Sequence, residues 1–598
     1  MMLPLLVVLQ AKAVLDTQRV SALREETRAG QAVVAVQARE ARERGATTVA
    51  GLLAIVPFVQ QRTARGELSP SVRAARREQV VVTLDGLPLN DPATGVTDLA
   101  DLPLIMLDRL VVRSGAAPVD GGSGAVGGVM ALSTAARSAL SLGVASFGQR
   151  TVEGMWAGAQ GRTKSFVAMS RRTGRNDFPF LNAAGAEPVT ERRINNDEQR
   201  TNLAVGWRTP RHQLMTIMSH GERGMVGAAN VRAYDQDRAS TARALLRAQT
   251  VIGATVLRTG LRHFALAYRD PQDPLRDARS QVTAADLEWS GMAAGGSWRI
   301  GGGHDALHAT GDVHQNRARV FAAWERQAVV SSRVVIDAGG RFDAVHGTVG
   351  TPTGNLGVSL RMSNDTLAPM WMLHGRVARA LRVPTLYDLF FHSPQRVSVR
   401  ALRPERVNVD GSVGTRVERT RDRTRWQAEW SVVHRRTADA IVWFPGNFGW
   451  SPANAGREIL NGAELRSALE RPRVALSAWG TWYDARLVSG GLQIPTPYVA
   501  RVNGALLSQW RPTESWRGSA QWRWQGRRPY TAGPRNAAFE LPAVQLLDLA
   551  ISRRVGPSVQ PWLVSVALDN AMNVGWQSVR GFPMPGRSWS VTTSWPAR

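Results

Sequence analysis

Short segments in which polar and apolar residues strictly alternate constrain this chain more than any other feature. The clearest one runs from Trp516 to Arg527. Successive side chains of a strand point to opposite faces, so one face of this segment carries its tryptophans and the other carries Arg517 and Arg523. Arginines on one face and tryptophans on the other are typical of a wall between a wet lumen and a lipid belt.

The same alternation recurs through the chain after Ser138. It is found around Trp430, from Trp562 to Leu568 and from Trp589 to Trp595. A soluble β-sandwich alternates as well. The number of such segments over about 460 residues, together with 20 tryptophans, favours a membrane barrel, because barrels gather aromatic side chains at both membrane interfaces.

Hydropathy excludes a helical membrane protein. The longest apolar run, Leu3 to Leu9, is far shorter than the ~20 residues that a spanning helix needs, and the mean hydropathy is -0.20. A spanning β-strand needs only ~10 residues, and half of them face a polar lumen, so a barrel gives a weak hydropathy signal of this kind.

The net charge of +26 would suggest a nucleic-acid partner in a soluble chain. The basic residues are nearly all arginine, however, and they are interleaved with Asp and Glu along the whole chain instead of forming a basic block. We therefore expect no nucleic-acid binding. The chain has no cysteine, which excludes disulfides and thiolate metal sites and suits an oxidising compartment.

No catalytic constellation is apparent. The segment from Gly121 to Ala125 approaches a nucleophile elbow, but Ala125 replaces the second glycine and no acid or histidine is placed to partner Ser123. The ten histidines lack metal-ligand spacing. We expect no enzyme activity, no cofactor and no metal site of the protein's own.

A different kind of sequence lies between Val80 and Thr134. Two β-branched runs, at Val80 to Thr83 and at Leu110 to Val112, are followed by turn-forming Asp, Gly, Asn or Pro. Six glycines between Gly115 and Gly128 let backbone approach backbone, and a buried strand follows. Upstream, the apolar spacing from Val49 to Val56 predicts a helix. The segment predicts a compact domain of short strands.

The motif order of this domain resembles the plug of TonB-dependent receptors, the gated outer-membrane transporters of Gram-negative bacteria. The motifs are DGLPLND at 85–91, LP and LDRLVVR within 102–113, and GSGAVGGV at 122–129. Three positions depart from the family pattern, at Ala74, Ser114 and Gly121. Downstream, LRVPTLYDL at 381–389, LRPE at 402–405 and NGAEL at 461–465 resemble barrel segments of the same family.

The resemblance implies an all-β fold, a 22-stranded antiparallel transmembrane β-barrel with an N-terminal α+β plug domain inside the lumen. We expect a signal peptide at residues 1–13, a TonB box and linker at 14–39, the plug at 40–136 and the barrel at 137–598. Ala11-Lys12-Ala13 fits a signal-peptidase site, although the usual basic start is missing.

The segment after that site resembles a TonB box, to which TonB would add a strand by main-chain pairing. A plain flexible tail is the alternative. The proposed box comprises Asp16, Thr17, Gln18, Arg19, Val20, Ser21 and Ala22.

The implied function is energy-coupled import of a scarce, metal-containing nutrient such as cobalamin or a ferric siderophore. The small barrel and short loops look most like the cobalamin receptor branch. A plugged barrel that serves as an adhesin or sensor without transport is the alternative. Ligand contacts are expected on two apical plug loops, Thr63 to Ser71 and Leu89 to Leu99. The candidates are Arg65, Glu67, Ser69, Asn90, Asp91, Thr94, Thr97 and Asp98.

The resemblance also implies how the plug is held. We expect plug residues Arg73 and Arg113 to form an ion cluster with barrel residues Glu405 and Glu464, because a lone buried charge is costly. Four separately solvated lumen charges are the alternative. The implied partners are TonB with its inner-membrane energising complex, a small metal chelate, outer-membrane lipid and lipopolysaccharide, and the barrel-insertion machinery, which would bind a monomer near Trp595.

Overall fold

The fold is described from a computed structural model of the chain. The described residues are 29–31, 33–64, 66–135, 137–182, 187–229, 236–362, 369–390, 399, 401–446, 449–531, 538–556 and 561–596. The proposed signal peptide, the proposed TonB box and Arg65 lie outside them. Within these ranges no helix is long and apolar enough to cross a membrane.

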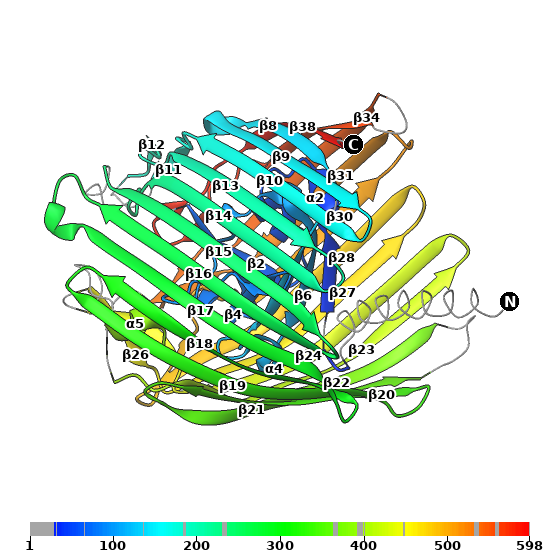
Figure 1. The fold of residues 1–598 in the computed structure, drawn as a ribbon. Helices are drawn as coiled ribbons and strands as arrows, with labels where there is room; N and C mark the ends of the chain where they lie inside the picture. The colour runs from blue at the N-terminus through cyan, green and yellow to red at the C-terminus, as the bar shows by residue number, and fades with distance from the viewer. Residues whose placement is uncertain are drawn as a thin grey trace.

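Antiparallel strands close into a barrel in which each strand pairs with its neighbours in the chain and the last pairs with the first (Figure 1). Two short strands, β29 and β30, pair with the same edge of β28 and fill one position, so the wall has 22 strands. The strands are β8 Ala139–Ala145, β9 Gln149–Gln160, β10 Thr163–Gly174, β13 Glu198–Arg208, β14 His212–Gly224, β15 Arg238–Ile252, β16 Thr255–Arg269, β17 Ala278–Ala293, β18 Gly296–Ala309, β19 Val313–Val329, β20 Val334–Val345, β21 Thr348–Arg361, β22 Met370–Arg382, β23 Glu405–Arg421, β24 Thr424–Ala438, β27 Arg457–Glu470, β28 Val474–Ser489, β29 Leu492–Pro495, β30 Val502–Trp510, β31 Trp516–Gln525, β34 Val544–Val555, β35 Trp562–Asp569 and β38 Ser588–Pro596.

The alternation predicted from the sequence is confirmed in the wall. In β31 Trp522 is 42% exposed on the outer face, whereas its neighbour Gln521 is 3% exposed in the lumen. In β35 Val566 is exposed and Ser565 is buried. Apolar and aromatic side chains therefore cover the outside, and polar side chains fill the inside.

The two ends of the barrel differ. One end, the short-turn end, has tight turns such as Gly253–Ala254 between β15 and β16. The other, the long-connection end, carries extra elements. These are β11 Pro179–Asn182, β12 Val189–Arg192, η6 Pro274–Arg276, α5 Leu386–Phe390, β25 Ile441–Gly446, β26 Gly449–Asn454, β32 Arg528–Thr531, β33 Ala538–Leu541, β36 Gln577–Val579 and β37 Phe582–Pro583.

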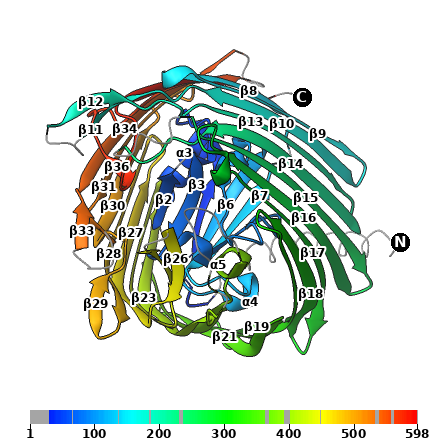
Figure 2. The ribbon, with the colours of Figure 1, turned by 90° about the vertical axis from the view of Figure 1, so that its left-hand side faces the viewer.

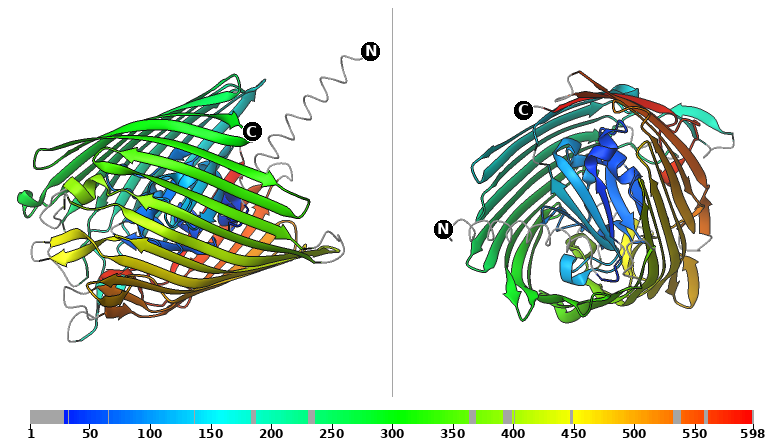
Figure 3. Two further views of the ribbon diagram at one scale, coloured as in Figure 1. Left: turned by 90° about the horizontal axis from the view of Figure 1, so that it is seen from below. Right: turned by 90° about the vertical axis from the view of Figure 1, so that its right-hand side faces the viewer.

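The N-terminal domain lies inside the barrel (Figures 2 and 3). Its five-stranded sheet has the order β1-β6-β7-β4-β5, in which only β4 and β7 are parallel. Its elements are β1 Val33–Gln37, α2 Ala38–Arg42, α3 Val49–Ala54, β2 Val59–Ala64, β3 Glu67–Val72, η1 Arg77–Gln79, β4 Val80–Leu84, β5 Leu87–Pro88, η2 Leu99–Asp101, η3 Leu104–Met106, β6 Leu107–Ser114, α4 Pro118–Gly121 and β7 Gly128–Thr134. The expected helix and strands are present.

The expected start of this domain needs correction. Strand β1 pairs with β6 along its whole length, from Val33 opposite Arg113 to Gln37 opposite Arg109. The plug therefore begins at or before Val33, and the stretch assigned to a linker up to residue 39 includes an edge strand. The residues of VVAVQ alternate between buried and exposed, as in a strand. Five residues are too few, however, to identify a strand from the sequence alone.

Candidate ligand and plug-docking site

Arg73 and Glu464 form a buried bidentate ion pair between plug and barrel. Nε and Nη2 of Arg73 donate to the two carboxylate oxygens, both at 2.8 Å. The carboxylate also accepts the Tyr483 hydroxyl at 2.7 Å and the Ser431 hydroxyl at 3.3 Å. Side-chain exposure is 3% for Arg73 and 1% for Glu464, so the pair is shielded from water on both sides.

Glu405 lies in a second network, with partners other than those expected. It accepts from Arg382 Nε at 2.7 Å, from Gln79 Nε2 at 3.0 Å and from Arg76, which also reaches Glu458 at 3.0 Å. The glutamate therefore contacts the plug through η1 and the residue before it. The sequence interpretation did not select Arg76, although it lies only three residues after Arg73.

The expected cluster of four residues is wrong for Arg113. This side chain approaches Asp120 of the plug at 3.8 Å. In β6 it shares a face with Arg109 and Val111, and that face lines a cavity on the side of the plug opposite to its core. The strand alternation therefore turns Arg113 away from the two glutamates.

The polar side chains of the loop Leu89 to Leu99 mostly bind backbone groups of the loop itself and of the neighbouring strand β4. Asn90 accepts from the Val82 amide at 2.8 Å and donates to the carbonyls of Val80 and Gly95 at 2.9 and 2.8 Å. Asp91 accepts from the Ala93 amide at 2.8 Å, and burial raises the pKa of Asp91 to about 6. These residues shape the loop, and their contact with a ligand stays a prediction.

Thr94, Thr97 and Ser69 complete the candidates of the two loops. The Thr94 hydroxyl accepts from the Val96 amide at 3.2 Å, and both Thr97 and Ser69 are buried. The remaining two, Glu67 and Asp98, are engaged by the barrel, as described next.

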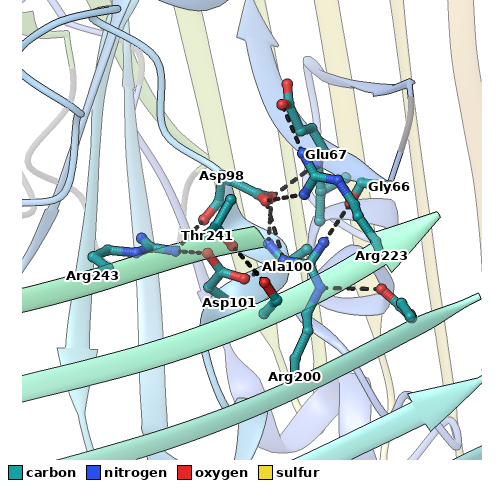
Figure 4. Close-up of polar contacts among 12 residues, drawn as sticks. Gly66, Glu67, Asp98, Ala100, Asp101, Arg200, Arg223, Thr241 and Arg243 are labelled. Carbon is teal, nitrogen blue, oxygen red and sulfur yellow. Dashed lines mark hydrogen bonds and ion pairs between the residues drawn. The ribbon is translucent and has the colours of Figure 1, made fainter. Parts of the chain in front are cut away.

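Three arginines on adjacent barrel strands bind the two apical plug loops, and we call them the arginine clamp (Figure 4). Arg200 of β13 donates to Asp98 at 3.2 Å and to the Gly66 carbonyl at 2.7 Å. Arg223 of β14 pairs with Glu67 at 3.0 Å. Arg243 of β15 donates to the Asp98 carbonyl at 3.2 Å.

The clamp converges on Asp101 at the end of η2, which pairs with both Arg200 and Arg243. Burial raises the pKa of Asp101, but the two guanidinium groups outweigh burial and hold it well below its usual range. The carboxylate is therefore ionised at neutral pH. Asp101 lies two residues outside the expected loop, and no local motif marks it.

Barrel arginines also donate to main-chain carbonyls elsewhere on the plug. A carbonyl acceptor leaves no trace in the sequence, so only the abundance of arginine could have indicated these contacts. The donors and acceptors are Arg172 to Ala100, Arg247 to Asp85, Arg262 to Asn90, Arg299 to Val119, Arg317 to Pro92, Arg376 to Ala116 and Arg435 to Arg73.

A cavity of about 1590 Å³ separates one face of the plug sheet from the barrel wall. Its lining reaches from Ala254 and Ser297 near the short-turn end to Asp305 and Arg317 near the long-connection end. Among the described residues, no group of three or more His, Asp or Glu is arranged to hold a metal ion.

Two sequence profiles match the chain. Residues 147–573 match the family described as TonB dependent receptor-like, beta-barrel, and residues 25–129 match the TonB-dependent Receptor Plug Domain. The chain belongs to the TonB-dependent receptor family. This TonB-dependent receptor therefore lies in the outer membrane of a Gram-negative bacterium, as the resemblance implied. The family consists of receptors and transporters, not enzymes.

Solved structures share the fold at low sequence identity. The siderophore receptor PirA from Acinetobacter baumannii is 12% identical, with a TM-score of 0.75 over 94% of this chain and 98% of that chain. The ferric yersiniabactin uptake receptor FyuA from Yersinia pestis is 14% identical, with a TM-score of 0.72 over 95% and 98%. The copper transporter OprC is 14% identical, with a TM-score of 0.73 over 94% and 100%. No curated protein sequence matches this chain.

Proposed function

We propose that this TonB-dependent receptor imports a scarce metal-containing nutrient, as a ferric siderophore or cobalamin, across the outer membrane. The observation that carries the proposal is a folded plug held inside a closed barrel by the arginine clamp and by the buried pair of Arg73 and Glu464. A lumen closed in this way needs an input of energy to open, and family members take that energy from TonB.

The solved structures support a metal chelate as the substrate. One of them is described as a siderophore receptor, one as a ferric yersiniabactin uptake receptor and a third as a copper transporter, at identities that establish the fold alone. We therefore place ferric siderophores ahead of cobalamin, which the small barrel had favoured. Ligand contact at the loops Thr63 to Ser71 and Leu89 to Leu99 is part of the proposal.

The decisive experiment is growth of a deletion strain on a panel of ferric siderophores and cobamides as the only source of iron or cobalamin. A transporter gives a growth defect on one ligand that the cloned gene restores. A protein that acts only as an adhesin or sensor gives no growth defect on any member of the panel.

A substitution in the proposed TonB box tests energy coupling. Proline at Val20 removes an amide donor and fixes φ, so strand addition by TonB should fail. We expect uptake by Val20→Pro cells to collapse while binding of the ligand at the cell surface stays near the wild-type level. Substitution of Arg19 by Lys, which keeps the backbone donor, is the matched control. Uptake at the wild-type rate in the proline variant would rule out this box.

A further inference from the structure

The barrel wall along the cavity carries arginines at four successive levels, which we call the arginine ladder. Backbone pairing puts Arg262, Asp305 and Arg317 in the first row, and Arg247, Asp286 and Arg319 in the second. Arg258 lies opposite Glu288 in the third row, and Arg299 lies opposite Ser290 in the fourth. Rows on one face are about 6.8 Å apart, because each residue adds about 3.4 Å.

Six arginines in the ladder face three carboxylates. Asp305 pairs with Arg317 at 3.1 Å and with Arg319 at 3.2 Å. Asp286 pairs with Arg262 at 2.8 Å and also with Arg319, and Glu288 pairs with Arg258 at 2.8 Å. All three carboxylates are thus already paired within the wall, and the wall keeps an excess of positive charge.

Acidic side chains of the plug balance part of the positive charge of the wall. Among the described residues, the barrel side of the cavity lining has ten basic and five acidic side chains, whereas the plug side has two basic and five acidic ones. The closed plug therefore presents a negative face to a positive wall. If the plug moves, its acidic groups move with it and the wall is left uncompensated.

Plug carbonyls also occupy donors of the ladder at three of its four levels. Arg262 donates to Asn90 at 3.2 Å, Arg247 donates to Asp85, and Arg299 donates to Val119. Arg247 has no carboxylate within ion-pair distance among the described residues. A carbonyl satisfies a guanidinium hydrogen bond without neutralising its charge, so an anion would bind such a group more strongly.

An apolar seal lies directly above the first row. Tyr387 and Leu386 of α5 pack with Ala93 of the plug and with Val282 and Leu307 of the wall. Val282 and Leu307 pair with each other one row above Ala284 and Asp305. Arg317 joins the plug to the segment before α5, since it donates to the carbonyls of Pro92 at 3.4 Å and Pro384 at 3.0 Å. The ladder therefore starts where the seal ends.

We propose that the arginine ladder is the internal binding track for an anionic substrate, which replaces the plug's carbonyls and acidic groups when the plug moves. The substrate class is a metal chelate with several carboxylate, catecholate or phosphate groups. A neutral or cationic chelate would gain nothing from this wall. The assignment to a substrate rests on the proposed import function, but the charge of the wall can be measured without transport.

Thiol labelling of the full-length protein provides the measurement. The chain has no cysteine, so Gly260→Cys places a single thiol in the second row. A Cβ at Gly260 meets nothing closer than 3.6 Å, so the site has room. The probes are an anionic reagent, sulfonatoethyl methanethiosulfonate, and a cationic one, trimethylammonioethyl methanethiosulfonate. The rate at which each reagent labels the protein is divided by the rate at which the same reagent labels a free thiol in solution.

We expect the anionic reagent to react about threefold faster than the cationic one at low salt, because the closed plug balances only part of the wall's positive charge and a charged cleft concentrates counter-ions. About 1 M salt should abolish the ratio, since the Debye length is then about 3 Å. Arg247→Gln, which leaves no carboxylate unpaired, should bring the ratio close to one. The control is Arg523→Gln, a lumen arginine paired with Asp548 outside the cavity, and it should leave the ratio unchanged.

Equal rates for the two reagents at low salt, or equal effects of the two arginine substitutions, would overturn the ladder. The growth panel distinguishes a failure of the ladder from a failure of the import function. An anion-selective thiol in a protein that supports growth on no ligand would support the positive charge of the wall but would defeat both import and the role of the ladder as a substrate track. Import of neutral or cationic chelates alone would defeat the ladder and support import.

Discussion

At the scale of single residues, Glu464 receives two hydrogen bonds from Arg73 and one each from Tyr483 and Ser431. Its removal leaves a guanidinium 3% exposed to water with its main counter-charge gone. We expect Glu464→Ala to cost about 3 to 5 kcal/mol, because breaking a buried pair leaves an uncompensated charge. This free energy is lost from the docking of the plug, because the backbone hydrogen bonds between the barrel strands stay intact.

Limited proteolysis measures this loss. In Glu464→Ala the plug should be cleaved faster than in the wild type while the barrel stays resistant. Glu470→Ala, at the exposed end of the same strand β27, is the matched control and should behave as wild type. Equal cleavage of the plug in both variants would show that other contacts hold it.

The sequence allowed the pair of Arg73 and Glu464 to be anticipated, because each residue stands in a motif that resembles the family pattern. It did not allow Arg76 or Asp101 to be anticipated. The barrel partners of these two residues are more than 90 positions away, on strands whose relative placement depends on the closed barrel. The direction of Arg113 depends on the register of β6, which one position would reverse.

At the scale of elements, the arginine clamp joins η2 and the β2–β3 hairpin to three barrel strands. Asp101→Asn keeps the shape of the side chain but removes the charge shared by Arg200 and Arg243. We expect it to weaken docking of this part of the plug by about 3 kcal/mol. Hydrogen exchange of the amides in 63–71 and 89–101 should accelerate, while the amides of β6 and β7 should change little. Unchanged exchange in both loops would exclude a holding role for Asp101.

The clamp also has a predicted pH dependence. The folded-state pKa of Asp101 lies below its unfolded value, so its contribution is fully present above the unfolded pKa of about 3.9 and is lost as the pH falls toward the folded pKa. Exchange of the amides in 63–71 should therefore be constant from about pH 5 to 8, apart from the intrinsic rate, and should accelerate below about pH 4. The amides in 89–101 are left out of this comparison, because burial raises the pKa of Asp91 in that loop to about 6. Acceleration of the 63–71 amides near pH 6 would point to Asp91 instead of Asp101.

At the scale of the whole molecule, the barrel and the plug were predictable because both leave local patterns: alternation in the strands, and turn and glycine motifs in the plug. The start of the plug at β1 was not predictable from the sequence, because an edge strand of five residues is defined by its pairing with β6. The cavity and its ladder could not be derived either. They require the register between five neighbouring strands, and each strand shows only scattered arginines.

The whole fold predicts a simple biochemical behaviour. Protein purified from membranes should have the circular dichroism of a β-rich protein and should migrate in detergent gels as a compact band that shifts on heating, because the closed barrel resists detergent until it is heated. Recovery in the soluble fraction with a helical spectrum would contradict the barrel.

The contacts between barrel arginines and plug carbonyls have a consequence for how such a protein can diverge. Every residue type offers the same main-chain oxygen, so a change of side chain at Ala116 or Val119 does not by itself remove the acceptor that Arg376 or Arg299 uses. Docking of this kind depends on the path of the backbone and not on the identity of the residues. A lineage could then retain the plugged architecture while its sequence drifts to the 12 to 14% identity that separates this chain from its structural relatives.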